Sequence, residues 1–547
     1  MKMFASLLER LLHEPARNRK LDLLVDYLNK TPDPDRGYAI AALTGNLVLE
    51  SVKPAMLRRL IEDRVDPVLF RLSYDFVGDL SETIALLWPG KTTAKLDPDI
   101  GRIVEKMSAM KKQEAAAVLP MWLDALDARE RWALLKLVTG ALRVGVSTGL
   151  AKQALARWSG IDLQSIEEVW YAFKPPYFAL FSWLSGTTPR PDVKDAVVFS
   201  SPMLAHPLDR EALDALDPSA FSAEWKWDGI RIQLHASERE GRRRVTLFSR
   251  SGEDITGMFP DIVDAFPVFG TIDGELVAID RDNPKTADAG WQVSFAALQQ
   301  RLNRKSIPPK ILARYPARII AYDLLFAPDR EGIIRDLREK PFSWRREWLE
   351  HLVLSANDPR LSLSPLITFR DWDELAAERA ASANWEGIEG VMLKRAAGPY
   401  LAGRVAGEWF KWKRNPYLLD CVMMYAQRGH GKRASIYSDF TFGVWDGANL
   451  VPVGKAYFGF TDAELADLDR FVRHNTINRF GPVREVAHEP HKGMVLEIAF
   501  EGVQRSGRHK SGFAMRFPRV NRIRLDKVPE EADRIEALAQ LAGGKTA

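Results

Sequence analysis

Hydrophobic residues recur every three or four positions through much of the first two hundred residues of the chain, for example in the segments 4–12, 134–138 and 151–156. This period places them on one face of an α-helix. A polar connector that contains prolines, residues 185–192, interrupts the pattern. We therefore expect an all-helical first domain over residues 1–200.

The pattern changes after this connector. Residues 244–250, 270–279 and 317–325 are short β-rich runs around glycines. Such runs, with helical stretches between them, are typical of antiparallel strands in an α+β domain. We expect this second domain to span residues 201–415.

A second change follows Asn415-Pro416. The apolar runs at 421–425, 440–445 and 494–500 suggest the strands of a compact β-barrel. We expect this barrel to occupy residues 416–547, with a short helix in the tail from Glu530 onward.

The composition describes an ordinary globular protein of several domains. The chain has 547 residues, of which 46% are hydrophobic and 10% aromatic, and this length exceeds what one core supports. The net charge is only +4, so binding to nucleic acid would depend on local basic surfaces. Cys421 is the single cysteine, which excludes internal disulfides and cysteine-rich zinc modules. The single cysteine also fits a reducing cytoplasm, which is the location we expect. No apolar run approaches the roughly 20 residues that cross a bilayer, so we expect no membrane association.

The chemistry is clearest in the run Glu224-Trp-Lys-Trp-Asp-Gly-Ile-Arg231. Lys226 stands in the pattern Lys-x-Asp-Gly-x-Arg, which suits a lysine that attacks the α-phosphate of a nucleotide and forms a phosphoamide. Such an amine must lose its proton, which nearby positive charge and desolvation favour. The following Asp-Gly pair predicts a tight turn that lets the backbone approach a nucleotide closely. Taken alone, the run also fits a surface strand that ends in a charged turn.

Two carboxylates lie beside glycines further along the chain, one at the end of a β run and one in a glycine-rich turn. Glu275 belongs to Asp273-Gly-Glu275, and Glu389 belongs to the segment 386–394. Hard oxygen ligands of this kind suit Mg²⁺ or Mn²⁺, which would neutralise charge on phosphate oxygens. Either residue alone is more simply an ordinary turn carboxylate.

Alternation in Trp409-Phe-Lys-Trp-Lys413 predicts a strand with Lys411 and Lys413 on one side and aromatic residues on the other. Two lysines that face a phosphate would stabilise the charge that develops there. The same pattern also fits a solvated strand face. Tyr322 could stack on a purine, although an aromatic residue in a core is the simpler interpretation.

A set of charged and aromatic residues follows in an order that resembles the ATP-dependent DNA ligases: Lys226, Arg250, Glu275, Tyr322, Glu389, Lys411, Lys413 and then Arg524-Leu-Asp-Lys527. These enzymes belong to the covalent nucleotidyltransferases, together with RNA ligases and capping enzymes. The segments 142–145, 202–207 and 516–519 also resemble cellular DNA ligases with an N-terminal helical domain, among them a bacterial type found beside nuclease and helicase partners. The resemblance implies an all-α DNA-binding domain, an α+β nucleotidyltransferase (adenylation) domain and an OB-fold β-barrel. It further implies a monomer that seals nicked duplex DNA with ATP as adenylate donor.

The resemblance also implies roles for individual residues. Lys226 would carry the adenylate, and Glu224 and Tyr322 would hold the adenine. The other implied contacts are Arg231, Arg250 and Glu275 around the ribose and phosphates, Lys411 and Lys413 at the α-phosphate, and Arg524 and Lys527 at the leaving pyrophosphate. One position departs from the family, which usually has an arginine where this chain has Val405; the neighbouring Arg404 is the expected substitute.

Contacts to the DNA backbone are expected at two basic turns. The segment 142–149 places glycines and hydroxyls just ahead of a helix, whose free N–H groups suit a phosphate, although a plain interhelical turn is the simpler local interpretation. The second turn is the glycine-rich run 428–433, which could also be a solubilising hairpin tip. The basic residues concerned are Arg143, Lys152 and Arg157 at the first turn and Arg428, Lys432 and Arg433 at the second.

The residues alone leave other functions open. An RNA ligase or a GTP-dependent capping enzyme shares Lys-x-Asp-Gly, but capping enzymes generally lack a long helical domain. A NAD-dependent ligase is disfavoured because one cysteine cannot build the four-cysteine zinc site of that family. A non-catalytic DNA-binding scaffold is disfavoured by the complete set of charged positions. We expect His488-Glu-Pro-His491 to be a loop rather than a metal site, because proline interrupts a helix and no third ligand is evident.

Overall fold

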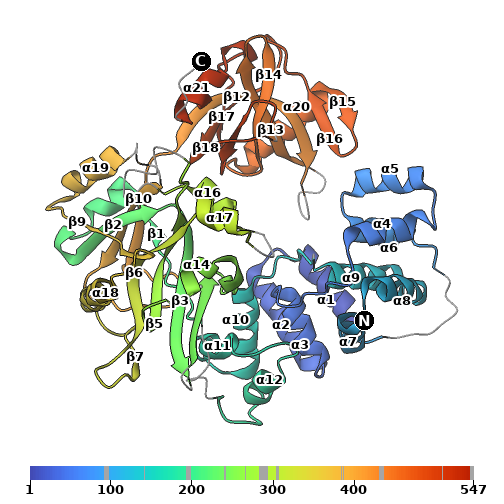
Figure 1. The fold of residues 1–547 in the computed structure, drawn as a ribbon. Helices are drawn as coiled ribbons and strands as arrows, with labels where there is room; N and C mark the ends of the chain where they lie inside the picture. The colour runs from blue at the N-terminus through green and yellow to red at the C-terminus, as the bar shows by residue number, and fades with distance from the viewer. Residues whose placement is uncertain are drawn as a thin grey trace. The chain divides into compact units, whose positions relative to one another are not determined.

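Two units emerge from the residue contacts in a computed structural model of the chain. One consists of Glu167–Ala172 and Asp192–Asn415, and the other of Met1–Ile166, Phe173–Pro191 and Pro416–Ala547. Figure 1 shows helices in the N-terminal part, a mixture of helices and strands in the central part, and a curled sheet in the C-terminal part. The structure describes residues 1–90, 98–140, 142–191, 199–239, 242–264, 266–282, 293–302, 307–382, 385, 387–429, 436–507 and 509–542.

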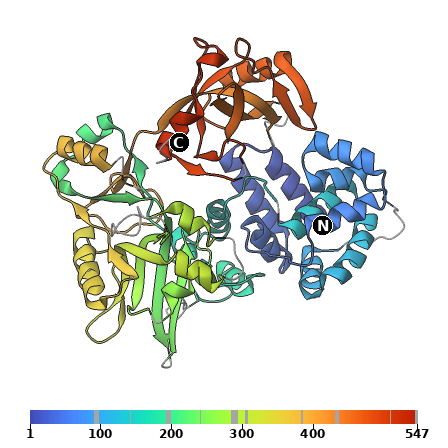
Figure 2. The ribbon, with the colours of Figure 1, turned by 45° about the horizontal axis from the view of Figure 1, so that its top comes forward.

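The N-terminal part confirms the expected all-helical region (Figure 2). Helix α9 starts at a capping box, in which Asp127 and Glu130 each accept a hydrogen bond from the other's backbone N–H, and it ends at the left-handed Gly140. The apolar stripes meet in a core that includes the fully buried Leu8 and Leu134. The helices are α1 Lys2–His13, α2 Arg17–Lys30, α3 Asp35–Leu43, α4 Pro54–Glu62, α5 Pro67–Val77, α6 Leu80–Leu87, α7 Ile100–Ala109, α8 Lys112–Ala125, α9 Ala128–Thr139, α10 Thr148–Ser159, α11 Leu163–Trp170 and α12 Phe178–Leu184.

The central part is an α+β unit built on two sheets, as expected. The first sheet has the order β1-β11-β10-β2-β9 and the second β4-β3-β5-β6-β7, with β8 beside β6. Its strands are β1 His206–Pro207, β2 Phe221–Trp227, β3 Ile230–Arg239, β4 Arg242–Ser249, β5 Gly270–Ala278, β6 Ala317–Pro328, β7 Ile334–Asp336, β8 Leu361–Leu363, β9 Leu366–Ile367, β10 Ile388–Arg395 and β11 Trp409–Lys413. Its helices are α13 Arg210–Asp214, α14 Pro260–Val263, α16 Phe295–Gln299, α17 Pro309–Arg314, α18 Phe342–Ala356 and α19 Trp372–Ala381.

Alternation along the strands of the second sheet separates its core from its polar positions. Ile272 and Leu276 on β5, like Ile232 on β3, join a buried cluster that also includes residues of α14, α16 and α18. Because successive side chains of a strand point to opposite faces, the intervening positions point the other way. Those positions include Arg231 and Glu275.

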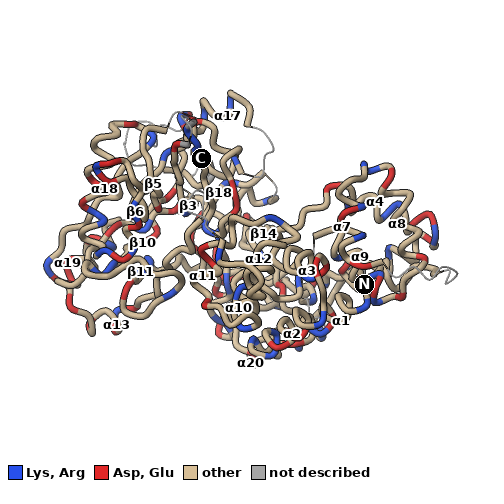
Figure 3. The backbone as a smooth tube through the Cα atoms, turned by 90° about the horizontal axis from the view of Figure 1, so that it is seen from below, with Lys and Arg blue, Asp and Glu red and all other residues tan. Residues whose placement is uncertain are grey.

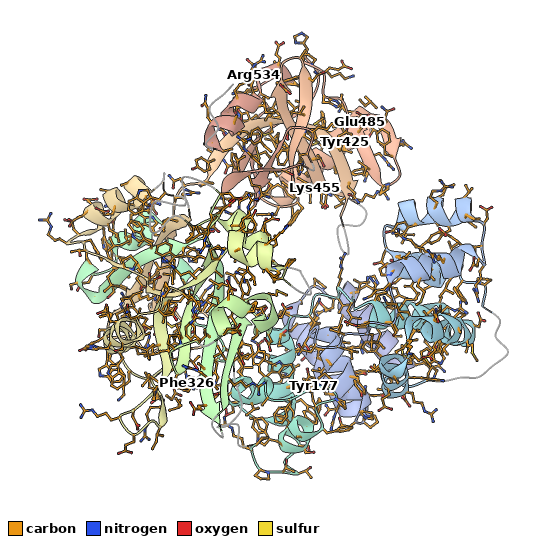
Figure 4. The ribbon with its side chains drawn as sticks, in the orientation of Figure 1. Tyr177, Phe326, Tyr425, Lys455, Glu485 and Arg534 are labelled. Atoms are coloured by element: carbon orange, nitrogen blue, oxygen red, sulfur yellow. The ribbon has the colours of Figure 1, made fainter. Side chains whose placement is uncertain are left out.

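The C-terminal part is the expected OB-fold barrel. Its main sheet has the order β14-β13-β12-β16-β15, and β17 pairs with both β12 and β20. Figure 4 shows Tyr425 and Glu485 beside one another on neighbouring strands, in agreement with their register. The elements are β12 Tyr417–Arg428, β13 Tyr437–Asp446, β14 Asn449–Ala456, α20 Asp462–Asn475, β15 Thr476–Phe480, β16 Val483–Val486, β17 Val495–Phe500, β18 Gly502–Arg505, β19 Phe513–Arg516, β20 Arg519–Ile523 and α21 Ile535–Leu541.

Two local expectations for the barrel can be compared with the structure. The tail helix begins at Ile535, not near Glu530, because Pro529–Glu531 forms a 3₁₀ turn and Ala532 is extended. The segment from His488 to His491 lies in a turn outside any helix, which confirms the loop.

Positions of basic and of acidic residues are interleaved along the backbone (Figure 3), consistent with the small net charge of +4. Within the described part of the chain, no helix combines the length and the apolar character needed to cross a membrane.

Candidate nucleotide site

The polar faces of the two central sheets meet around a small set of contacts. Lys394 on β10 donates a hydrogen bond of 2.9 Å to the carbonyl of Tyr322 on β6. The Lys394 ammonium also lies 4.6 Å from the ring centroids of Tyr322 and Trp409, and Arg231 on β3 lies 5.6 Å from the Trp409 ring. Side chains of both sheets therefore share one site.

Lys226 reaches this site from the end of β2. Phe221, Trp225 and Trp227 face the apolar cluster on the far side of the sheet, so Lys226 takes the opposite face. The chain then crosses from the first sheet to the second at Asp228-Gly229. A Cβ atom at Gly229 would lie 2.5 Å from the carbonyl oxygen of Leu276. The glycine of the motif is thus required by the close approach of this turn to β5.

Glu389 faces Lys226 because of an irregularity in β10. The register between β10 and β2 shifts between Ile388 and Gly390, and Gly390 has φ +145. Such a bulge re-aims a side chain, and it brings Glu389 to the lysine face. The Glu389 carboxylate forms a short ion pair with Lys226 and lies 3.5 Å from the ammonium of Lys413.

Several cations surround Lys411 on β11. Burial lowers the pKa of Lys411, and Arg404, Lys226, Lys413 and Arg250 lower it further in that order. The structure therefore brings together five of the cations that the resemblance implies near the phosphates. Their mutual repulsion means that a bound polyanion would be favourable here.

The strand that carries Lys411 and Lys413 differs in one respect from its predicted pattern. Phe410 and Trp412 join the apolar cluster behind the sheet, as expected. Trp409 instead packs with Met203 and Tyr400 in a separate cluster, because alternation along the strand puts it on the same face as the lysines. The prediction that all the aromatic residues cover the other side is wrong for Trp409.

Glu275 on β5 is the carboxylate most affected by this environment. Burial raises its pKa from 4.5 to about 8; Lys226 and Arg231 oppose the rise, whereas Glu389 and Asp228 add to it. Two carboxylates that repel one another, with hard oxygen atoms, suit a divalent cation that phosphate oxygens also bind. Across the described residues, no group of three or more His, Cys, Asp or Glu side chains could hold a metal ion by itself. The hard oxygen atoms of Glu275 and Glu389 fit the chemistry of such a divalent cation.

Arg231 is held in place by three partners. Its guanidinium donates to both carboxylate oxygens of Asp273, at 3.1 and 2.6 Å, and to the carbonyl of Met203 at 2.6 Å. The Tyr400 hydroxyl accepts from Arg231 at 3.2 Å and donates to Asp273 at 2.6 Å. Arg231 is thus fixed in a buried network beside the nucleotide site.

Glu224, expected to hold the adenine, is 1% exposed. One of its carboxylate oxygens lies 2.8 Å from Arg346 and the other 2.5 Å from Lys394. Burial raises the pKa of Glu224 and lowers that of Lys394, and the ion pair opposes both changes. Tyr322 is partly buried above Lys394, so an adenine contact by either residue stays a prediction.

Arg250 is exposed in the turn that follows β4. Tyr171 supports this turn through a hydrogen bond of 3.2 Å to the carbonyl of Ser251. Arg524 and Lys527 lie in the barrel, where both form ion pairs with Asp420.

The first of the two expected DNA-binding turns has an ordered shape. Arg143 is exposed with φ 47, and Ser147 caps the start of α10. Lys20 is buried and donates hydrogen bonds to the carbonyls of Val144 and Gly145, at 2.7 and 3.2 Å. Lys20 therefore holds the carbonyls of the turn inward.

The other residues predicted to contact DNA differ in their surroundings. Lys152 is 3% exposed, and Arg157 forms an exposed ion pair of 2.8 Å with Asp22. Arg428 lies 5.7 Å from the Tyr437 ring. Lys432 and Arg433 lie outside the described residues.

Sequence reasoning missed four residues of the site. Asp273 could have been found from the sequence, since a carboxylate in the middle of an apolar run is rarely buried without a partner. No local pattern marks the other three, Tyr400, Lys394 and Arg346, because their partners lie far away along the chain.

Comparison with known proteins agrees with this site. Residues 202–413 match the family model described as the ATP dependent DNA ligase domain, and residues 433–527 match that of the ATP dependent DNA ligase C terminal region. The chain is 30% identical to a probable DNA ligase of Koribacter versatilis, over 99% of this chain and 96% of the relative. It is also 30% identical to DNA ligase 1 of Korarchaeum cryptofilum, over 99% of this chain and 98% of the relative.

A solved structure named Pmar-Lig_PreS3 shares the fold, with a TM-score of 0.58 at 15% identity, over 95% of this chain and 99% of that chain. From the family models and the full-length relatives, the chain belongs to the ATP-dependent DNA ligases, which seal nicks in DNA through an adenylate intermediate.

Proposed function

We propose that Lys226 is the residue that carries the adenylate in this ligase. Its Nζ would attack the α-phosphorus of ATP, a P–N bond would form, the bond to pyrophosphate would break, and the amine would lose a proton. The AMP would then pass to the 5′-phosphate at a nick, from which the neighbouring 3′-hydroxyl would displace it. This proposal rests on a cluster of cations around Lys411. Four of them lower the pKa of Lys411 by repulsion: Arg404, Lys226, Lys413 and Arg250. A bound triphosphate would relieve this repulsion.

The ion pair with Glu389 gives the reaction its first requirement. It holds the amine against the carboxylate, so Lys226 must leave Glu389 before its Nζ can attack a phosphorus atom. Lys413 lies 3.5 Å from the same Glu389 oxygen. We propose that Lys413 takes over this carboxylate when Lys226 turns toward the phosphate.

We propose that Glu275 and Glu389 hold a divalent cation, Mg²⁺ or Mn²⁺, together with the nucleotide. When bound, such an ion supplies positive charge that offsets the negative charge of the phosphate oxygens. For Glu275 to serve as a ligand, its carboxyl group, with a pKa raised to about 8, must lose its proton.

The remaining roles rest on the resemblance and on the surroundings of each residue. We propose residues 1–200 as a DNA-binding domain, 201–415 as the adenylation domain and 416–547 as the OB-fold domain. The exposed Arg143 suits a contact with a DNA phosphate, whereas the buried Lys152 suits a supporting role. Arg231, held by Asp273 beside the nucleotide site, would contact the ribose.

The test is a covalent adduct. After incubation with ATP and Mg²⁺, mass spectrometry should find AMP on Lys226 in the native protein, and α-labelled GTP should give no label. Lys226→Ala should fail on an ordinary nick yet still seal a nick that is already adenylated. An unmodified Lys226 peptide in folded protein, or label from GTP alone, would refute the proposal.

A further inference from the structure

One carboxylate in the barrel holds both cations of the Arg524-Leu-Asp-Lys527 run. Asp420 on β12 lies 2.8 Å from the Arg524 guanidinium and 2.6 Å from the Lys527 ammonium. Its side chain is 9% exposed. Asp420 therefore fixes the distance between two cations that the linear motif leaves three residues apart.

Neighbouring segments hold the backbone of Asp420 on both sides. On one side, Asp420 pairs with Glu497 on the neighbouring strand β17. Its N–H donates a hydrogen bond of 2.7 Å to the Asp533 carboxylate, and its carbonyl accepts one of 2.9 Å from the Asp533 N–H. Asp533 thus lies beside the backbone of the strand that carries Asp420.

Arg524 and Lys527 differ in how many hydrogen-bond donors remain for a ligand. Arg524 donates to both oxygens of Asp526, at 2.9 and 2.7 Å, as well as to Asp420, and its side chain is 13% exposed. A guanidinium has five N–H groups in a rigid fork, so these acids occupy most of its binding edge. Lys527 has three rotatable donors, of which the described contact with Asp420 uses one, and its side chain is 31% exposed.

We propose that Asp420 is a positioning residue for adenylation, which fixes Lys527 as the contact for the leaving pyrophosphate, while Arg524 serves as a structural brace. This inference rests on the proposed adenylation of Lys226 and on the role at the leaving pyrophosphate that the family resemblance implies for Arg524 and Lys527. The sequence motif alone would give Arg524 and Lys527 the same role, whereas the inference gives them different ones. It also makes the position of Lys527 depend on Asp420, a residue outside the motif.

The inference predicts a defect in one step of the reaction. Asp420→Asn keeps the size of the side chain and removes the charge that holds Lys527. A charge-assisted hydrogen bond corresponds to roughly ten- to a hundredfold in a rate or binding constant. We therefore expect the rate of Lys226 adenylation to fall at least about tenfold, with a raised KM for ATP. Sealing of a pre-adenylated nick, which releases no pyrophosphate, should stay within about twofold of the native rate.

A matched control and a double variant separate positioning from general damage. Glu501→Gln disrupts another barrel ion pair, 3.1 Å from Arg519, and should leave adenylation unchanged. If Asp420 acts through Lys527, the Asp420→Asn and Lys527→Gln double variant should adenylate no more slowly than Lys527→Gln alone. If Asp420→Asn fails to fold, Asp420→Glu, which keeps the charge but displaces it by one methylene group, should show the same step-specific loss.

Three outcomes would overturn the inference. Asp420→Asn could form the Lys226 adduct at the native rate, or it could seal a pre-adenylated nick as poorly as it adenylates Lys226. In the third outcome, the double variant would adenylate more slowly than Lys527→Gln, so that the two effects add. These outcomes differ from failure of the proposed function. If the native protein forms no adduct at Lys226, the proposed function fails; if it does and Asp420→Asn forms the adduct equally fast, only the role of Asp420 fails.

Discussion

Replacing Glu275 by glutamine should stabilise the protein and abolish its adenylation. Glutamine has nearly the shape of glutamic acid but never ionises. Glu275 is held in a site where burial raises its pKa to about 8, with further repulsion from Glu389 and Asp228. At neutral pH the folded protein must therefore keep a proton on Glu275 that the unfolded chain has lost, and glutamine removes this cost.

The size of the effect follows from the two pKa values. Between pH 4.5 and about 8, the unfolded chain has lost a proton that the folded protein still binds, so the contribution of Glu275 to stability falls as the pH rises through this window. At pH 7 this loss covers about 2.5 pH units, each worth 1.36 kcal/mol, which gives about 3 kcal/mol. For a domain of 150–250 residues, each 1 kcal/mol corresponds to roughly 2–4 °C in Tm.

The assay is thermal unfolding followed by tryptophan fluorescence at several pH values, with and without Mg²⁺. We expect the Tm of Glu275→Gln to exceed that of the native protein by roughly 6–12 °C at pH 7, and the two values to converge near pH 4.5. Mg²⁺ with ATP should raise the Tm of the native protein far more than that of the variant, because binding to the folded state stabilises it. The variant should form no Lys226 adduct.

A surface carboxylate gives a control of opposite sign. The backbone N–H of Arg370 donates to Glu374, and this bond, with that from the Arg370 side chain, lowers the pKa of Glu374. Glu374→Gln should therefore lower the Tm slightly at neutral pH. A Glu275→Gln protein that is less stable than the native protein at pH 7, or whose Tm advantage does not vary with pH, would refute the reasoning.

Three further predictions concern residues that support the sites. In Gly229→Ala, the new Cβ would lie 2.5 Å from the Leu276 carbonyl oxygen; the turn must shift, so we expect a loss of about 1–3 kcal/mol in urea unfolding and at least about tenfold slower adduct formation by mass spectrometry. Tyr400→Phe removes the hydroxyl that donates to Asp273 at 2.6 Å and should cost about 1–3 kcal/mol by the same unfolding assay. Lys20→Met should weaken binding of nicked DNA in fluorescence anisotropy without changing its salt dependence, because Lys20 holds the turn before α10 from within; a slope reduced by about one would instead indicate direct contact with a phosphate.

The regular elements of this protein could be predicted because each follows from a short stretch of sequence. The apolar spacing around Leu8 and Leu134 belongs to α1 and α9, and the runs near 270 and 317 belong to β5 and β6. Hydrophobic period is a local property, and burial of one face enforces it. The tail helix was misplaced by several residues because the 3₁₀ turn at Pro529–Glu531 is held by partners elsewhere in the barrel, including Trp445, whose indole donates to the Pro529 carbonyl.

Pairing between distant residues could not be predicted, and it decides much of the site. Glu224 meets Arg346 and Lys394 across more than a hundred residues, and Tyr400 meets Asp273 in the same way. Nothing local in the sequence marks these partners. The face of β10 on which Glu389 lies could not be predicted either. Simple alternation along the strand places Glu389 on the apolar face with Val391, but the bulge at Gly390 turns its side chain to the opposite face.

The positions that break the apolar pattern nevertheless point to the site, and energetics explains why. Strand β5 is buried along almost its whole length, yet it carries Asp273 and Glu275. Placing a carboxylate on such a strand costs stability unless a partner compensates it. Asp273 has its partner in Arg231, but the raised pKa of Glu275 shows that its compensation is incomplete. A carboxylate that destabilises the folded protein at neutral pH supports our proposal of a bound cation, whose positive charge would complete the surroundings of Glu275.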